Sequence, residues 1–288
     1  MTPIVSHPPD PSYAEPRPIE TSLGTVWLTD EGEGPLVIAI AGLPGSHRDW
    51  RWMAPRLRRY ARLVRLDMPG FGLTPLRQGI RPRAAWRADL VAAVADSLEV
   101  RRFAAIAHSM SGPVLASLAA RYRERVIAAG FVACGGSRPH RLWRSMPISP
   151  PAASELLASD VGRRWLMPVT RAAFRRAGFA ASIADEELVT ALHCAAATDF
   201  AQVRRDLARI TAPCLVAASE DDPLIEPTLA DEIGASVPAG PRLRFPDGGH
   251  GIHKVYADEI AEAFAPLLAH SSVAVTSTPG HRSSSREA

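Results

Sequence analysis

Short apolar runs alternate with longer amphipathic stretches between about residues 22 and 136. Four short runs, three of them continuously apolar, predict strands at residues 36–41, 62–66, 103–106 and 127–132. The stretch 86–98 is helical by period, with its apolar side chains on one face, and 113–122 is also helix-like. Strands that alternate with helices predict a mostly parallel sheet with crossover helices, which is an α/β fold.

The pattern changes after residue 137. Up to residue 210 the sequence contains only helix-like stretches separated by turn-forming residues, and no strand of comparable quality. Strand character returns at 214–218 and, more weakly, at 242–245, and residues 258–268 predict a closing amphipathic helix. A helical insertion within a parallel sheet explains this order.

These patterns divide the chain into five parts. We expect a flexible N-terminal segment over 1–20, the first part of the core over 21–138, the helical insertion over 139–210, the second part of the core over 211–270, and a disordered Ser/Thr-rich tail over 271–288.

Composition narrows the function classes. The 288 residues are 47% hydrophobic, which suffices for a sizeable core. The net charge is +3, but Lys254 is the only lysine among 33 basic residues, and these are scattered among 30 acidic ones. Because no stripe of one charge forms, we expect no nucleic-acid partner.

The cysteines and the apolar runs indicate the cellular compartment of the protein. Cys134, Cys194 and Cys214 lie in apolar surroundings without metal-like spacing, as expected of small core residues in a reducing compartment. No run has signal-peptide or bilayer-spanning character. We therefore expect a cytoplasmic protein without a membrane partner.

The segment 107–112 predicts a nucleophile elbow. It stands between a predicted strand and a helix-like stretch, so Ser109 would project its Oγ above the sheet edge while the helix start directs backbone N–H groups to the same space. The small residues Ala107 and Ser111 flank the serine at two positions where backbone crowding favours minimal side chains.

Together with this elbow, four further segments resemble the α/β-hydrolase superfamily across roughly residues 20–270. They are AGLPGS at 41–46, RLDMPGFG at 65–72, ASEDDP at 218–223 and DGGHGIH at 247–253. The resemblance implies the α/β-hydrolase fold: a mostly parallel, doubly wound sheet of about eight strands with a helical cap at 139–210.

The resemblance also implies a catalytic triad in the family's chain order. Ser109 would be the nucleophile, Asp222 the acid and His250 the base. Asp221, and after it Glu220, are alternative acids, because all three carboxylates lie in the same turn. His253 is an alternative base, and His108 is expected to pack against the other face of the sheet.

The family's oxyanion loop matches residues 41–46. Pro44 has no N–H, so the backbone N–H groups of Leu43 and Met110 are the expected oxyanion donors. Ala41 stands where the family commonly has histidine. Asp67 is expected to hold its loop together rather than to act in catalysis.

The predicted cap supplies the expected substrate pocket. Apolar side chains expected to bind the substrate are Trp143, Met146, Trp165 and Phe174. We expect a preference for small to medium apolar esters over charged ones, although the cap's surplus of arginine leaves an anionic substrate open.

The expected activity is hydrolysis of carboxylic esters, lactones or thioesters through an acyl-serine, without a metal or organic cofactor. Carbon–carbon bond hydrolysis, acyl transfer and perhydrolysis are alternatives on the same triad, and a ligand receptor without turnover is a further one. The expected partner is a small-molecule substrate. The sequence does not fix the oligomeric state, and a homodimer is one alternative.

Overall fold

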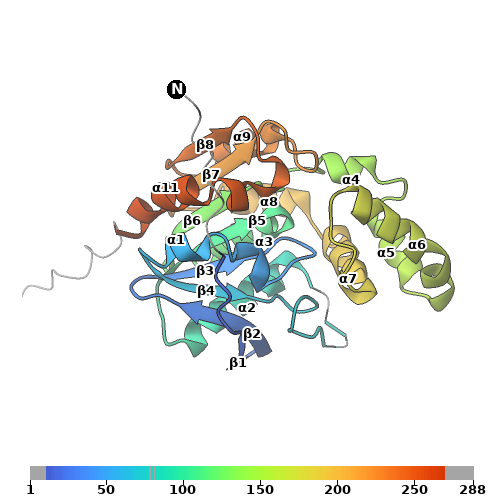
Figure 1. Cartoon of the computed structure of the whole chain (residues 1–288), viewed down its shortest axis with the longest axis horizontal. Helices are drawn as coiled ribbons and strands as arrows, with labels where there is room; N and C mark the ends of the chain where they lie inside the picture. The colour runs from blue at the N-terminus through green and yellow to red at the C-terminus, as the bar shows by residue number, and fades with distance from the viewer. Residues whose placement is uncertain (1–10, 78, 81, 270–288) are drawn as a thin grey trace, which may run out of the picture.

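A computed structural model describes residues 11–77, 79–80 and 82–269 of the chain. Its sheet has the strand order β1-β2-β4-β3-β5-β6-β7-β8 (Figure 1). The strands are β1 (Arg17–Thr21), β2 (Gly24–Glu31), β3 (Leu36–Ile40), β4 (Arg62–Leu66), β5 (Phe103–His108), β6 (Val126–Val132), β7 (Cys214–Ser219) and β8 (Arg242–Phe245). This is the α/β-hydrolase arrangement expected from the sequence.

Strand pairing is parallel from β4 through β3, β5, β6 and β7 to β8, while β1 pairs antiparallel with β2 and β2 antiparallel with β4. The parallel strands β3, β5, β6 and β7 are buried along their whole length, which explains their continuous apolar runs. The edge strand β1 alternates exposed and half-buried residues, so it lacks such a run. The flexible segment expected over 1–20 is therefore wrong from Arg17 onward, where β1 begins.

Helices cover both faces of the sheet. They are α1 (Ala54–Leu57), α2 (Ala84–Ser97), α3 (Gly112–Arg121), α4 (Arg141–Ser145), α5 (Pro150–Leu157), α6 (Asp160–Arg176), α7 (Asp185–Ala196), α8 (Phe200–Leu207), α9 (Pro227–Ser236), α10 (Ile252–Val255) and α11 (Ala257–Ala269). Three short 3₁₀ segments are η1 (His47–Trp50), η2 (Ser109–Ser111) and η3 (Gly249–Gly251). The apolar residues of α1 and α11 pack on one face of the sheet, and those of α2, α3, α8 and α9 on the other.

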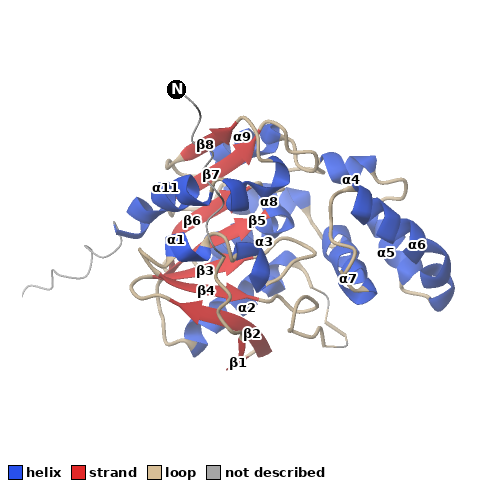
Figure 2. Cartoon of the chain, in the orientation of Figure 1, coloured by secondary structure: helices blue, strands red, loops and turns tan. Residues whose placement is uncertain are grey.

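The insertion between β6 and β7 consists of helices α4 to α8 among the described residues. Helices α4 to α7 gather to one side of the sheet as a cap (Figure 2), and α5, α6 and α7 pack on each other around a small apolar cluster of their own. Helix α8 packs against α3, so the last part of the insertion returns to the core.

Some expectations concern segments at the ends of the chain. The predicted tail over 271–288 lies outside the described residues, as do residues 1–10. Within the described part, no helix combines the length and the hydropathy needed to span a bilayer.

Candidate active site

A sharp turn follows β5 at the carboxyl edge of the sheet. Ser109 has a φ of +56°, a left-handed conformation that is uncommon for residues other than glycine, and α3 begins three residues later. Ala107 is fully buried, and the Ser111 hydroxyl donates to the carbonyl of Ala41. This turn directs the Ser109 side chain toward the loops that follow β7 and β8.

Gly112 is the residue that the turn constrains most tightly. A Cβ at this position would lie 2.2 Å from the carbonyl oxygen of Gly135. Sequence reasoning considered the flanking residues Ala107 and Ser111 and missed this one, because the close approach comes from a loop after a different strand.

The structure brings the three predicted catalytic residues together. His250 lies in η3 after β8, and its Nε2 is 2.8 Å from Ser109 Oγ. Its other ring nitrogen, Nδ1, is 2.8 Å from Asp222 Oδ2 in the loop after β7. In this geometry one imidazole nitrogen can accept the serine proton while the other is held by a carboxylate.

Asp222 is buried and held by backbone donors. The N–H groups of Leu224 and Ile225 both donate to its Oδ1, at 2.8 and 3.0 Å. Burial raises the pKa of Asp222, but the hydrogen bond and charge of His250, with these two N–H donors, outweigh it and keep the pKa below its ordinary value. The carboxylate is therefore ionised and fixed in direction before any substrate arrives.

The alternative acids and base have other positions. Asp221 accepts from the N–H of Gly249 at 2.8 Å, and Glu220 pairs with Arg244. His253 is buried, and neither of its ring nitrogens has a hydrogen-bond partner in the described part of the chain. Of the candidates left open by the sequence, Asp222 and His250 are those that form the chain of contacts to Ser109.

His108 packs on the face of the sheet predicted for it and also contacts the predicted base. Its ring lies 4.1 Å from that of His253 and edge-on to Trp50, and its Nε2–H donates to the carbonyl oxygen of His250 at 2.9 Å. Burial lowers the pKa of His108 well below its ordinary value, and the charges of His253 and His250 act in the same direction. A neutral His108 thus holds the backbone of the histidine loop.

The expected oxyanion loop lies against the elbow. A Cβ on Gly42 would be 3.0 Å from Ser109 Cβ and from His108 Nδ1, so the backbone before Leu43 approaches Ser109 closely. The buried carboxylate of Asp67 accepts from the N–H groups of His47 and Leu73. The expectation that Asp67 holds its loop together is confirmed by these bonds.

A cavity of about 730 Å³ opens above Ser109 and His250. Its apolar lining includes Leu43 from the core and Phe179 and Ile183 from the cap segment between α6 and α7. Charged residues lie along the same cavity: Arg48, Asp49, Arg51, Glu187 and Lys254. The site is therefore amphipathic rather than uniformly apolar.

The four cap residues expected to bind the substrate do not line this cavity, and that expectation is corrected. Trp165 is 74% exposed on α6, and Trp143 packs against Phe200. Met146 and Phe174 pack against the cap's own apolar cluster. The physical reason is that the cap is thick enough to have a core of its own, and helical periodicity does not distinguish that core from a cavity wall.

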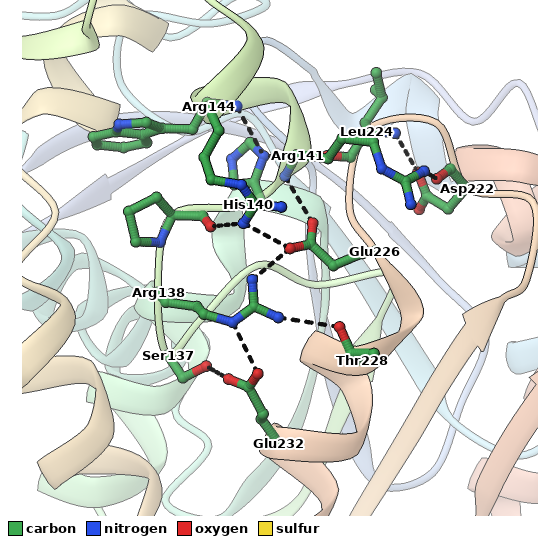
Figure 3. A network of polar contacts seen from close by, with 12 residues as sticks. Ser137, Arg138, His140, Arg141, Arg144, Asp222, Leu224, Glu226, Thr228 and Glu232 are labelled. Atoms are coloured by element: carbon green, nitrogen blue, oxygen red, sulfur yellow. Dashed lines mark hydrogen bonds and ion pairs between the residues drawn. The ribbon is translucent and has the colours of Figure 1, made fainter.

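A network of ionic contacts joins the first turn of the cap to the loop that carries Asp222 (Figure 3). Glu226 pairs with Arg138 and, at 2.8 Å, with Arg144, and its other oxygen accepts from the N–H of Arg141 at 2.7 Å. The Arg141 guanidinium donates to the carbonyl of Asp222 at 2.6 Å. Burial alone would raise the pKa of Glu226, but the hydrogen bonds from Arg138, Arg144 and the backbone lower it to about 2.

The described residues contain no group of three His, Cys, Asp or Glu side chains placed to hold a metal ion. The cysteines Cys134, Cys194 and Cys214 are free and buried, as expected of core residues. Burial raises the pKa of each of these thiols.

Residues 37–263 match the model of the Alpha/beta hydrolase family, and the chain belongs to this family. The Magnesium-chelatase 30 kDa subunit of Rhodobacter capsulatus is 27% identical to it over 82% of this chain and 88% of that protein. The 2-hydroxy-6-oxo-2,4-heptadienoate hydrolase of Pseudomonas putida is 35% identical, but over only 34% of this chain and 37% of that protein.

Solved structures extend the likeness of fold to almost the whole described chain. A thermophilic esterase from Thermogutta terrifontis superposes with a TM-score of 0.69 at 20% identity, over 89% of this chain and 99% of that one. At such an identity the likeness concerns the fold alone.

Proposed function

We propose that this protein is a serine hydrolase that cleaves carboxylic esters, lactones or thioesters through an acyl-serine intermediate. The observation that carries the proposal is the continuous chain of contacts from Ser109 Oγ through both nitrogens of His250 to Asp222. The nucleophile is a serine, which suits attack on a carbonyl carbon.

In the proposed reaction, Ser109 Oγ attacks the substrate carbonyl while His250 Nε2 takes the hydroxyl proton. The backbone N–H groups of Leu43 and Met110 would stabilise the oxyanion. His250 then returns the proton to the leaving oxygen or sulfur, so that an ester remains on Ser109; the alcohol or thiol departs, or in a lactone stays attached to the acyl chain as a hydroxyl group. Water attacks that ester, its proton passes to His250, and the carboxylic acid is released as Ser109 regains its proton.

The cavity lining supports a small to medium acyl group. Leu43, Phe179 and Ile183 offer apolar surface in the cavity that Ser109 also lines. The volume of about 730 Å³ lies within the ordinary range for a small-molecule site. In this proposal Phe179 and Ile183 contact the acyl group, in place of the residues expected from the sequence, Trp143, Met146, Trp165 and Phe174.

The test compares Ser109→Ala with Ser117→Ala, which alters another buried serine, in α3. Hydrolysis of p-nitrophenyl butyrate should fall roughly 10⁴-fold or more in Ser109→Ala and should persist in Ser117→Ala. A fluorophosphonate probe should label the wild-type protein at Ser109 and leave Ser109→Ala unlabelled. Equal turnover by the wild type and Ser109→Ala would refute the proposal.

A second candidate function is hydrolysis of a carbon–carbon bond in a dienoate, by attack on its ketone. The partial similarity to the heptadienoate hydrolase favours it, as do the cationic residues Arg48, Arg51 and Lys254 along the cavity, which suit a substrate carboxylate. Rapid loss of the visible absorbance of a 2-hydroxy-6-oxo-dienoate, with slow hydrolysis of p-nitrophenyl butyrate, would select this candidate over the first.

A further inference from the structure

Helix α6 exposes apolar side chains on the side away from the cap cluster. Val161, Trp165 and Val169 are 70%, 74% and 49% exposed. They are spaced four residues apart, so they form one stripe along the helix. Large apolar side chains that cluster on the surface of a protein are typical of sites that contact a partner molecule or a membrane.

Arginines flank this stripe. Arg164, Arg175 and Arg176 are exposed, and no ion pair among the described residues involves them, whereas Arg163 and Arg171 of the same helix pair with Glu186 and Asp185. Asp160, in the first turn, is the only acidic residue in α6. We call Val161, Arg164, Trp165, Val169, Arg175 and Arg176 the outer face of α6.

We propose that the outer face of α6 docks this protein on the surface of a bilayer that contains anionic lipids. A helix that lies in a membrane interface carries apolar side chains, often tryptophan, beside arginines that reach the lipid phosphates. The outer face of α6 has this composition, and the chain's net charge of +3 favours the same kind of surface.

A second copy of this chain fits the face less well. In a two-fold contact through α6, the three arginines of one copy would approach those of the other, and the single acidic residue of the helix cannot balance them. A lipid surface instead supplies negative charge next to every arginine.

Docking through α6 has a consequence for the cavity. The helix ends at Arg176, and the next residues, Ala177 to Ile183, include several that line the cavity. A docked α6 would therefore hold the cavity close to the lipid surface, from which an apolar ester could enter. This proposal departs from the expectation that the protein has no membrane partner, and it gives the exposed Trp165 a role.

The experiment is cosedimentation of the full-length protein with vesicles, at low and at physiological salt. We expect binding to phosphatidylcholine vesicles with about 30 mol % phosphatidylglycerol and at least tenfold weaker binding to pure phosphatidylcholine. The double variants Trp165→Ala/Val169→Ala and Arg175→Gln/Arg176→Gln should each lower binding to the anionic vesicles roughly tenfold.

Two control variants change the same properties elsewhere. Arg59→Gln/Arg123→Gln removes two exposed arginines and gives the same net charge, and Tyr60→Ala removes an exposed aromatic ring outside the cap. Both should bind the anionic vesicles like the wild type, and circular dichroism checks that every variant is folded.

Three outcomes would overturn the proposal. The first is no binding of the wild type to anionic vesicles at low salt. The second is an equal loss of binding in the charge-matched control, which would reduce the effect to net charge. The third is that light scattering finds the wild type to be a dimer and the Trp165→Ala/Val169→Ala variant to be a monomer. A second copy of the chain, and not a bilayer, would then cover the outer face of α6.

Discussion

The loops at the carboxyl edge of the sheet and the cap hold their side chains in different ways. Asp222 is 1% exposed, and hydrogen bonds from three other residues fix its carboxylate. On α6, Trp165 is 74% exposed and has no comparable partner among the described residues. The comparison indicates that the sheet edge is built for fixed chemistry, while the cap is built as a separate small body with one face toward the cavity and another toward its surroundings.

Substitution of His108 should give the largest effect among three tests of this comparison. His108→Phe keeps a ring in the cluster with Trp50 and His253 but removes the donor to the carbonyl of His250. Because His250 is the proposed catalytic base and a small displacement of such a base is costly, kcat/KM for p-nitrophenyl butyrate should fall roughly 10- to 100-fold.

A conservative variant separates positioning from packing. His108→Gln retains an N–H donor with a smaller side chain, so it should recover part of the lost kcat/KM, whereas a pure packing role would make the two variants equally poor. Circular dichroism and a thermal melt show whether each variant is folded. If His108→Phe is as active as the wild type, the sheet edge is less rigid than these contacts indicate.

Much of the sheet edge could be predicted from the sequence, because each loop there follows a stretch with strand character, continuous and apolar in β5 and β7 and weaker in β8. Ser109, Asp222 and His250 follow β5, β7 and β8, and parallel strands bring their carboxyl ends to one edge. Gly112 and the contact from His108 to the His250 backbone could not be read in this way. Both arise where loops from different strands contact each other. The hydrophobic periodicity of the sequence predicts helices and strands but not contacts between loops.

The cap could be predicted only as a set of helices. Phe174 and Phe179 are both aromatic and five residues apart, yet Phe179 lines the cavity and Phe174 packs behind it in the cap cluster. An apolar side chain in a cap can lie in the cap's own core, line the cavity or be exposed on the outer surface. The choice among them is made by tertiary packing, which the sequence pattern does not contain. The edge strand β1 could not be predicted because Ile19 is the only aliphatic residue among its five, which is too few to show an alternation.

Glu226 tests the contact between the two regions and should give an intermediate effect. Its pKa is lowered from 4.5 to about 2, so its ionic contacts stabilise the folded state fully above pH 4.5 and lose that contribution as the pH falls toward 2. Glu226→Gln should therefore lower the free energy of unfolding by about 2 kcal/mol at pH 7.

Urea unfolding at pH 7 and at pH 3 measures this effect. The difference between the wild type and Glu226→Gln should shrink at pH 3, because Glu226 is protonated in most unfolded chains there and the glutamine does not titrate. Glu124→Gln, at an exposed position without an ion pair among the described residues, should show little difference at either pH. A constant difference for Glu226→Gln at both pH values would contradict an ionic role for the network.

The smallest effects should come from within the cap, where Phe174→Ala and Trp165→Ala compare the inner and outer sides of one helix. The Phe174 ring is 5.1 Å from that of Phe179, which lines the cavity, so its loss should loosen the cavity wall and lower kcat/KM for p-nitrophenyl butyrate by roughly two- to fivefold. Trp165 is 74% exposed and is not among the residues that line the cavity, so Trp165→Ala should leave the turnover of this soluble ester and the melting temperature nearly unchanged. If instead Trp165→Ala lowers kcat/KM more than Phe174→Ala does, α6 turns its other side to the substrate in solution, and the division of the cap into an inner and an outer face is wrong.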